Sequence, residues 1–356
     1  MKITALILAG GKGERFWPRS RKNYPKQFLC LTGDGRTMIQ KTVDRIRSLV
    51  DPEDIFISTN AGYRELVKEQ LPEVPQANIL CEPVGRNTAP GIGLGAVHIR
   101  KKYDDAVMLV LPSDHLIKDE ETFRGVLSEA VKTAEDESCL VTMGIKPTAP
   151  ETGYGYIKFL REGAVGNAHK VERFVEKPNL EKAREYLADG GYLWNSGMFV
   201  WKVSVILGCM EKYLPEIYSG LVKIEEAIGS DAQESVLNDA FEKMPSESID
   251  YGVLEKEDGI RVLPGDFGWD DVGSWLALER MRELDGAGNM LSGNIVTVGV
   301  DNCIIEGGKK LIAAVGLKDL VIVDTEDAIL ICNKENTADI KKIVENLRKD
   351  KREEYL

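Results

Sequence analysis

Residues 3–16 read Ile-Thr-Ala-Leu-Ile-Leu-Ala-Gly-Gly-Lys-Gly-Glu-Arg-Phe, an unbroken apolar run that passes directly into a glycine-rich, basic loop. An apolar run of this length predicts a buried strand. Gly10 and Gly11 let the backbone approach a ligand closely, and they admit the positive φ that a sharp turn off the strand needs. Several N–H groups can then converge on a phosphate, and Arg15 and Lys26 add mobile positive charge beside them. The stretch therefore predicts a strand whose following loop binds phosphate.

Strand and helix patterns alternate from this first strand to residue 111. Strands are predicted at 3–8, 54–58, 77–80 and 106–111, with helices at 37–49, 63–70 and 88–102 between them. This alternation predicts an α/β fold with a doubly wound, mostly parallel sheet, in which ligands bind beyond the carboxyl ends of the strands. The pattern then becomes mixed, with strands at 140–144, 155–159, 171–176 and 197–201, a helix at 180–187 and a long helical stretch to residue 243.

The stretch Gly286-Ala287-Gly288-Asn289 marks the predicted boundary between a main domain, residues 1–285, and a C-terminal module, residues 286–356. The module shows short strand patterns at 294–298, 303–305, 311–315, 320–323 and 329–331, followed by a helix at 337–348. Their even spacing predicts a small sheet or a β-helix-like module. Such short strands bury little core alone, so we expect the module to pack on the main domain or on a second subunit of a homodimer.

Composition narrows the possible functions. The net charge of −12 argues against nucleic-acid binding, which needs a basic face, but it does not exclude nucleotides. The six cysteines are scattered and form no Cys-x-x-Cys pair, which argues against a zinc site and against a disulfide framework. No apolar run approaches the ~20 residues of a membrane span, and no signal-peptide pattern is present. We therefore expect a cytoplasmic protein.

Two familiar phosphate-binding signatures do not fit the first loop. The dinucleotide fingerprint fails because Phe16 stands where its third glycine should be, and no Gly-Lys-Ser or Gly-Lys-Thr completes a P-loop. This argues against a nicotinamide-dependent oxidoreductase.

Two further segments carry acidic residues that could bind a metal. Asp114 comes just after the strand at 106–111, where a carboxylate suits Mg²⁺ or, alternatively, caps a following helix. Asp270 and Asp271 precede Val272-Gly273 and could likewise bind a metal or cap a helix that begins near Ser274.

Residues in four further segments could bind a nucleotide or a sugar. Glu82 follows the third strand, and its two carboxylate oxygens complement the N1–H and 2-amino donors of guanine, although it could instead pair with Arg86 and only shape the loop. Gly155 allows close backbone approach, Glu176 can accept from sugar hydroxyls, and Asn195 offers both a donor and an acceptor. In structural terms alone, these segments are also compatible with ordinary turns and helix caps.

These segments resemble, in order, the motifs of the sugar-1-phosphate nucleotidylyltransferases. The resemblance covers residues 1–285 and is carried first by Gly10, Gly11, Gly13, Arg15, Pro25 and Lys26. Residues 81–90 and 248–256 resemble the guanylyl branch that acts on mannose 1-phosphate. The reaction implied is GTP plus mannose 1-phosphate giving GDP-mannose and pyrophosphate, with Mg²⁺ as the cofactor.

The resemblance also implies site residues. It assigns catalytic roles to Arg15, Lys26, Asp114 and Asp271, of which the two aspartates hold the metal. It assigns nucleotide binding to Ala9, Gly10, Gly11, Gly13, Glu82, Gly85, Arg86, Asn87, Thr88 and Ser113, and sugar-phosphate binding to Gly155, Glu176, Lys177 and Asn195. The attacking sugar phosphate is already anionic, so positioning and charge neutralisation can supply the rate without a general base.

Two rival functions remain. A nucleotidylyltransferase for another hexose 1-phosphate or base is disfavoured by residues 86–88 and 248–256, and a non-catalytic GDP-mannose-binding subunit would be expected to lose Arg15, Lys26 or a metal aspartate. Some longer relatives carry a fused isomerase domain with a histidine-based metal site. The last ~70 residues here contain no histidine, so we expect one activity only.

Overall fold

The computed structural model describes residues 1–356, and their contacts divide the chain into two compact units. Unit 1 consists of residues 1–10, 42–113 and 117–269, and unit 2 consists of residues 11–41, 114–116 and 270–356. The first loop therefore groups with the C-terminal part of the chain. The boundary at 285/286 stays a prediction about the domains.

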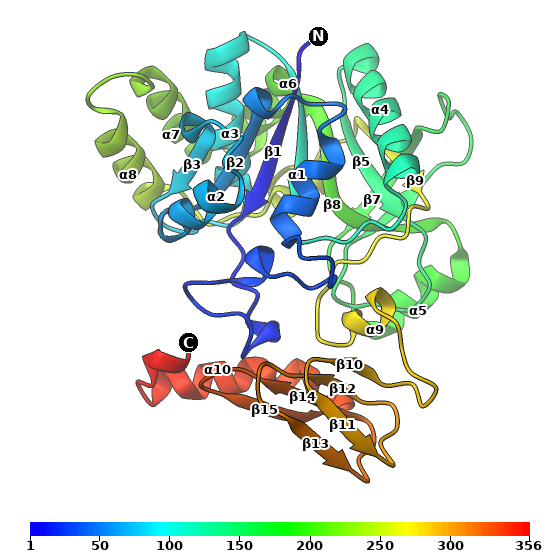
Figure 1. Cartoon of the computed structure of the whole chain (residues 1–356). Helices are drawn as coiled ribbons and strands as arrows, with labels where there is room; N and C mark the ends of the chain where they lie inside the picture. Colours follow the sequence, from blue (N-terminus) through cyan, green and yellow to red (C-terminus); the bar gives the residue numbers. More distant parts are fainter. The chain divides into compact units, whose positions relative to one another are not determined.

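Unit 1 is built on one nine-stranded sheet with the order β3-β2-β1-β4-β8-β5-β9-β7-β6 (Figure 1). The strands are β1 (Ile3–Ala9), β2 (Ile55–Asn60), β3 (Ile79–Glu82), β4 (Val107–Pro112), β5 (Leu140–Ile145), β6 (Tyr156–Phe159), β7 (His169–Val175), β8 (Tyr192–Lys202) and β9 (Ile260–Gly265). The first four run parallel to one another, whereas β8 is antiparallel to both β4 and β5. The mostly parallel, mixed sheet predicted from the sequence is confirmed.

Helices cover both faces of this sheet (Figure 1). They are α2 (Arg64–Gln70), α3 (Thr88–Tyr103), α4 (Glu120–Glu137), α5 (Leu180–Asp189), α6 (Val203–Tyr213), α7 (Pro215–Ala227) and α8 (Gln233–Lys243), while α1 (Met38–Ile46) continues from unit 2 into unit 1. Helices α3, α6 and α7 pack on one apolar cluster with Leu6, Met108 and Trp201 of the sheet. Burial on both faces explains why these strands are apolar without alternation.

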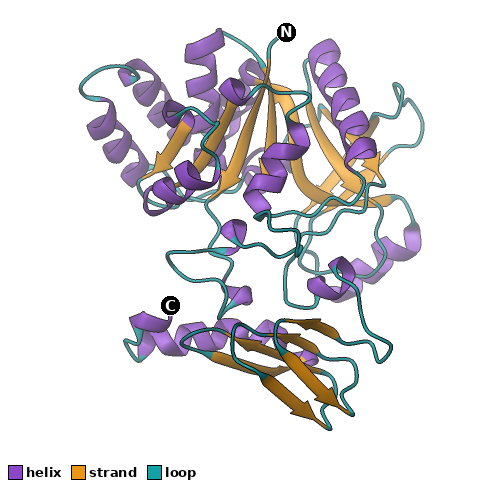
Figure 2. Ribbon diagram, viewed as in Figure 1, coloured by secondary structure: helices purple, strands orange, loops and turns teal.

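Unit 2 contains two small sheets (Figure 2). One has the order β10 (Met290–Ser292), β12 (Ile304–Glu306), β14 (Leu320–Asp324) and β15 (Ile329–Asn333), and the other pairs β11 (Ile295–Val298) with β13 (Ile312–Val315). Strands β10 to β14 alternate between the two sheets, and β15 then pairs with β14 in the larger one. All pairings except β14–β15 are parallel. This arrangement is a short β-helix, as the even strand spacing predicts, and it is followed by α10 (Ile340–Lys349).

A second apolar cluster ties the first loop into unit 2. Phe16 and Trp17 are buried with Trp275, Ile304 and Val344, and the rings of Phe16 and Trp275 lie 5.2 Å apart. Helix α9 (Ala277–Met281) contributes Ala277 and Leu278 to the same cluster. The loop after β1 is therefore held by its own aromatic residues.

Several elements differ from the sequence predictions. Helix α4 and strands β9 and β10 are present but were not predicted, and β8 is much longer than the predicted strand at 197–201. The long helical stretch to residue 243 is three helices, because Pro215 begins a new helix and residues 228–232 break the next one. No helix in the described chain is long and apolar enough to cross a membrane.

Candidate active site

Unit 2 holds a cavity of about 400 Å³ that brings together three separated parts of the sequence. It is lined by Lys12, Gly13, Glu14, Arg15, Phe16, Lys26, Asp114, His115, Asp271, Val272, Gly273 and Lys341. The four predicted catalytic residues, Arg15, Lys26, Asp114 and Asp271, all lie in this lining. The structure therefore places them around one space.

Gly13 is the glycine on which the shape of the loop depends. Its φ is +60°, and a Cβ at this position would lie 2.4 Å from Lys26 Cβ and 2.9 Å from the Lys26 backbone nitrogen. Gly10 and Gly11 do not adopt positive φ, so the expectation that they form the sharp turn is wrong. A Cβ at Gly10 or Gly11 would meet no atom within 4 Å, which leaves the space that close approach of a ligand requires.

Lys26 is the centre of the polar network in the cavity. Its side chain is 6% exposed, and its Nζ donates to Asp114 Oδ2 at 2.8 Å and to the backbone carbonyl of Asp271 at 2.7 Å. Burial raises the pKa of Asp114, but the positive charges of Lys26 and His115 outweigh burial and leave the pKa below its ordinary value. Asp114 is therefore ionised at neutral pH. It does not cap a helix, because Asp119 caps α4.

The second aspartate segment is a strained turn. Asp270 Oδ1 accepts from Val272 N at 2.8 Å, Asp271 Oδ1 accepts from Gly273 N at 3.2 Å, and Asp270 also pairs with Arg280. Helix α9 begins only at Ala277 and has no side-chain cap, so neither aspartate caps a helix. Val272 has a φ of +49°, which is unfavourable for a β-branched residue. Such strain is typical of functional sites.

The donor chemistry of the cavity fits Mg²⁺. No group of three or more His, Cys, Asp or Glu side chains could hold a metal ion. Asp114 and Asp271 nevertheless line the same space and are joined by Lys26, so the protein offers two hard oxygen ligands. Mg²⁺ is commonly held by one or two carboxylates, with substrate phosphates and waters completing its coordination. The pair suits a metal that binds together with a phosphorylated substrate.

In unit 1, the predicted guanine-binding residue Glu82 lies at the end of β3. Its Oε1 accepts from Ser58 Oγ at 2.7 Å, and a Cβ on Gly91 of α3 would come within 2.7 Å of the same oxygen. Burial raises the pKa of Glu82, and the Ser58 hydrogen bond only partly opposes that effect. The alternative in which Glu82 pairs with Arg86 is wrong, because the Arg86 guanidinium donates to the carbonyls of Phe241 and Glu242.

The loop after β3 is fastened to the segment at 247–249. Asn87 has a φ of +67° and caps α3 by accepting from Thr88 N. Thr88 is not the cap; its Oγ1 accepts from Ile249 N at 2.9 Å. A Cβ on Gly85 would meet no atom within 4 Å, so space remains beside the loop. The predicted residues 85–88 thus form one ordered turn in unit 1.

Ala9 and Ser113 lie where β1 and β4 end. The Ala9 carbonyl accepts from Thr59 Oγ1 at 2.9 Å, and Ser113 N donates to the Leu8 carbonyl at 3.1 Å. Both residues are buried. Their side chains are small, so they keep the carboxyl edge of the sheet open for a ligand.

The predicted sugar-phosphate residues form one cluster in unit 1. Asn195 Nδ2 donates to Asp250 Oδ1 at 2.9 Å, and Lys177 Nζ donates to Glu176 Oε1 at 2.6 Å. Glu176 Oε2 is buried without a hydrogen-bond partner, and a Cβ on Gly155 would lie 2.4 Å from it. Glycine at 155 therefore leaves room beside a buried strong acceptor whose hydrogen bond no group of the chain supplies. Lys177 carries a φ of +45°, again a strained position.

Asp250 is a member of this cluster that the sequence analysis did not assign. Burial, and then the negative charge of Glu176, raise its pKa to about 6. Its segment, residues 248–256, carries the resemblance to the mannose-1-phosphate branch. In the same segment, Ser248 Oγ accepts from Tyr251 N at 3.2 Å.

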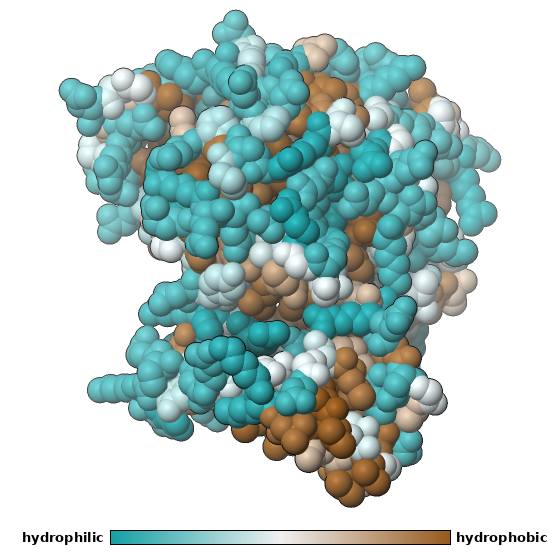
Figure 3. Space-filling model, in the orientation of Figure 1, coloured by the Kyte–Doolittle hydropathy of each residue, from teal (hydrophilic) through white to brown (hydrophobic).

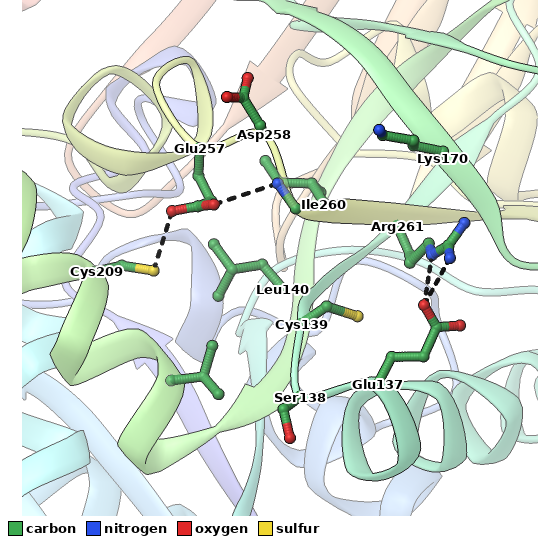
Figure 4. A pocket seen from close by; sticks show the side chains of 12 residues that line it. Glu137, Ser138, Cys139, Leu140, Lys170, Cys209, Glu257, Asp258, Ile260 and Arg261 are labelled. Atoms are coloured by element: carbon green, nitrogen blue, oxygen red, sulfur yellow. Dashed lines mark hydrogen bonds and ion pairs between the residues drawn. The ribbon is translucent and has the colours of Figure 1, made fainter.

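A different cavity, of about 480 Å³, lies near the amino ends of β5 and β9 (Figure 4). Its two thiols are not suited to nucleophilic chemistry, because burial raises the pKa of Cys139 to about 11 and that of Cys209 to about 12. Arg261 pairs with Glu137, and Cys209 donates to Glu257. Because the pKa values of both thiols are raised and Arg261 is already paired with Glu137, we do not assign this cavity a catalytic role.

Comparisons with known proteins found relatives over nearly the whole chain. The family model "Nucleotidyl transferase" matches residues 4–287, and "MannoseP isomerase/GMP-like beta-helix domain" matches residues 293–347. The chain is 45% identical over 361 residues to a mannose-1-phosphate guanylyltransferase of Escherichia coli, covering 99% of this chain and 75% of that protein. It is 44% identical over 362 residues to one of Salmonella montevideo, covering 99% and 76%.

A solved structure extends the likeness to three dimensions. A protein of Thermus thermophilus, described as a mannose-1-phosphate geranyltransferase, has a TM-score of 0.88 and 34% identity, with 98% of this chain and 100% of that chain covered. The match includes both the nine-stranded sheet and the β-helix, since it spans nearly all of the sequence. Family model, relatives and structure lead to the same conclusion: this chain belongs to the nucleotidyl transferase family.

Proposed function

We propose that the chain transfers GMP from GTP to mannose 1-phosphate, giving GDP-mannose and pyrophosphate. The observation that carries this proposal is the network in which Lys26 binds both Asp114 and the Asp271 segment, in a cavity also lined by Arg15. The identity of 41–45% to curated mannose-1-phosphate guanylyltransferases over nearly the whole chain supports the choice of nucleotide and sugar.

The chemistry requires little of the protein beyond position and charge. A phosphate oxygen of mannose 1-phosphate attacks the α-phosphorus of GTP, a new P–O bond forms, and the bond to the β-phosphate breaks to release pyrophosphate. Arg15 and Lys26 would bind the triphosphate and the negative charge that grows on the leaving group. Lys177 would bind the phosphate of the sugar. No residue has to remove a proton from the nucleophile.

Asp114 and Asp271 would hold Mg²⁺ in this reaction. When bound, Mg²⁺ supplies positive charge that screens the two phosphorylated substrates from each other. Lys26 keeps both aspartate segments in place, so the ligands are preorganised before substrate binds.

Sugar recognition would come from the cluster around Glu176. Its unpartnered Oε2 offers an acceptor for a sugar hydroxyl, and Asn195 and Asp250 provide further donor and acceptor groups. Because a buried polar group left unpaired is costly, this cluster favours a ligand that carries hydroxyl groups.

Guanine recognition would depend on Glu82. Glu82→Gln keeps the size of the side chain but removes one acceptor, so we expect the preference for GTP over ATP to fall by about tenfold or more. The measurement is kcat/KM for the two nucleotides. If the preference is unaltered, Glu82 is structural and main-chain groups recognise the base.

Two other activities fit less well. Geranyl transfer, named for the Thermus structure, requires a site for an apolar chain, whereas the cavity in unit 2 is lined mainly by charged residues. A non-catalytic subunit would not need Arg15, Lys26, Asp114 and Asp271 together.

A pyrophosphate-release assay tests the proposed function. The chain is incubated with each combination of GTP, ATP, UTP or dTTP and a set of hexose 1-phosphates, with Mg²⁺ or with excess chelator. Release with GTP and mannose 1-phosphate, dependent on Mg²⁺ and abolished in Lys26→Met, is expected. Faster release with a different pair would assign a different substrate, and release from no pair would contradict catalysis.

The proposal includes a homodimer joined through the β-helix. Val296, Val298 and Val315 are 56%, 63% and 68% exposed and point outward from the paired strands β11 and β13. They form part of the apolar surface that Figure 3 shows on these strands. Contiguous exposed apolar patches commonly mark protein–protein interfaces. The cytoplasmic location stays a prediction from the sequence.

A further inference from the structure

One lysine of the cavity comes from the C-terminal helix rather than from the glycine-rich loop. Lys341 is the second residue of α10, and it lines the cavity of about 400 Å³ together with Lys12, Arg15 and Lys26. No hydrogen bond or ion pair within the chain engages its ammonium group, whereas the neighbouring Lys342 pairs with Asp339 at 2.8 Å. Of the two adjacent lysines, Lys342 is therefore neutralised by an aspartate, whereas Lys341 keeps its charge available for a ligand.

The helix that carries Lys341 is fixed to the glycine-rich loop by contacts of its other residues. Seven residues later, Arg348 donates to Glu14 Oε1 at 3.0 Å, and residues seven apart lie on one face of an α-helix. Ile340 and Val344 are buried in the cluster that contains Phe16 and Trp17. Helix α10 is thus fastened to the loop at both a polar and an apolar contact, and Lys341 does not depend on a mobile segment.

The cavity has more positive than negative charge available for a ligand. Of its three carboxylates, Glu14 is engaged by Arg348, Asp114 is engaged by Lys26, and Asp271 accepts from Gly273 N. Arg15 reaches only the Gly273 carbonyl, at 3.4 Å, and no anion within the chain pairs with Lys12 or Lys341. A set of cations without anionic partners is suited to a polyphosphate.

We propose that Lys341 binds the phosphates of the nucleoside triphosphate and of the pyrophosphate that leaves, which makes the C-terminal module part of the active site. The inference rests on the proposed function for the identity of the nucleotide, but not for the binding of polyphosphate. The three N–H donors of the Lys341 ammonium group would add to those of Arg15 and Lys26 at the end of the triphosphate that carries most charge. No covalent step involves Lys341.

Lys341→Gln and Lys342→Gln provide a matched pair of variants. In the first, we expect the KM for GTP, and for pyrophosphate in the reverse reaction, to rise about tenfold, because a hydrogen bond to a charged group is lost. The KM for mannose 1-phosphate should stay within twofold, and Lys341→Arg should restore much of the affinity. In Lys342→Gln, all three KM values should equal those of the unchanged protein. Both glutamine variants should have the same melting temperature as the unchanged protein.

Calorimetric titration with inorganic pyrophosphate separates this inference from the proposed function. If the chain binds pyrophosphate, and Lys341→Gln weakens that binding while Lys342→Gln does not, Lys341 is a phosphate ligand even if the transfer assay shows another substrate. Equal pyrophosphate affinity and equal KM for GTP in Lys341→Gln and the unchanged protein would overturn the inference.

Discussion

At the scale of single residues, the site is a set of charged groups whose positions are fixed by a few short contacts. Lys26 is the clearest case, since one ammonium group binds the Asp114 carboxylate and the Asp271 carbonyl. Removing a partner of a nearly buried charge is costly, because the remaining charge loses both water and its counter-ion. Substituting these residues is therefore expected to lower both the stability of the site and the turnover.

Substitutions of Asp114, Asp271 and Asp270 test which carboxylates bind the metal. Asp114→Asn and Asp271→Asn should each lower turnover by at least about 100-fold, because a preorganised charge is removed from the site. Asp270→Asn is the matched control: it loses only the ion pair with Arg280, of roughly 0–1 kcal/mol, and should keep turnover within a few-fold. Near-normal turnover of either first variant at saturating Mg²⁺ would show that the ligands are different.

Asp250 predicts a pH dependence of stability. Its pKa of about 6 in the folded protein lies above the ordinary value of 3.8, so between these pH values the folded protein holds a proton that the unfolded chain has lost. The free energy of unfolding therefore falls as pH rises through this window, and the full cost is present above about pH 6. Asp250→Asn keeps an acceptor for Asn195 but carries no charge.

We expect Asp250→Asn to be more stable than the unchanged protein at pH 8, by on the order of 1–3 kcal/mol, and equal to it near pH 4. Denaturant unfolding at both pH values measures the difference. Asp258→Asn, at an exposed position, should show no such pH-dependent gain. A difference between the two proteins that is independent of pH would contradict the assignment.

At the scale of elements, the glycine-rich loop is shaped by contact with Lys26 rather than by the turn off β1. Gly13→Ala would place a Cβ against the Lys26 backbone at a residue with φ of +60°. We expect a loss of roughly 1–3 kcal/mol in the free energy of unfolding.

Gly11→Ala tests whether the loop can lose ligand binding without losing its own conformation. A Cβ at Gly11 meets no atom within 4 Å, so the melting temperature should not fall, while the affinity for GTP should. A lowered melting temperature in Gly11→Ala, or an unchanged one in Gly13→Ala, would contradict these assignments.

The same scale shows what the sequence can and cannot predict. Strands β1 to β4 were predicted because burial on both faces leaves an uninterrupted apolar run. Helix α4 also has a signal in the sequence, since Phe123, Leu127 and Val131 recur at helical spacing. The pairing of Asn195 with Asp250 joins residues 55 positions apart, and no local pattern reports such a contact. The motifs predict candidate site residues, whereas the hydrogen-bond partners of those residues required the fold.

At the scale of the whole molecule, the exposed apolar face of the β-helix predicts self-association. Val298 lies opposite Val315 in the β11–β13 pair, and both are more than half exposed. Sedimentation equilibrium should give a dimer at micromolar concentration, and Val298→Lys combined with Val315→Lys should give a monomer.

Val165→Lys, at a residue of unit 1 that is 59% exposed, is the control and should remain dimeric. A monomeric unchanged protein would rule out the dimer. A dimer that persists in the double variant would place the interface elsewhere.

The anchoring of the first loop also has a consequence for synthesis of the chain. Trp17 Nε1 donates to the carbonyl of Tyr355, a residue 338 positions later, and Phe16 packs in the same cluster as Val344. At translation rates of roughly 5–20 residues per second, the ribosome needs on the order of 15–70 seconds to make that partner after Trp17 has been added. For that period two aromatic side chains lack most of their final contacts. The apolar side chains of this loop therefore stay accessible to other chains until α10 has been made.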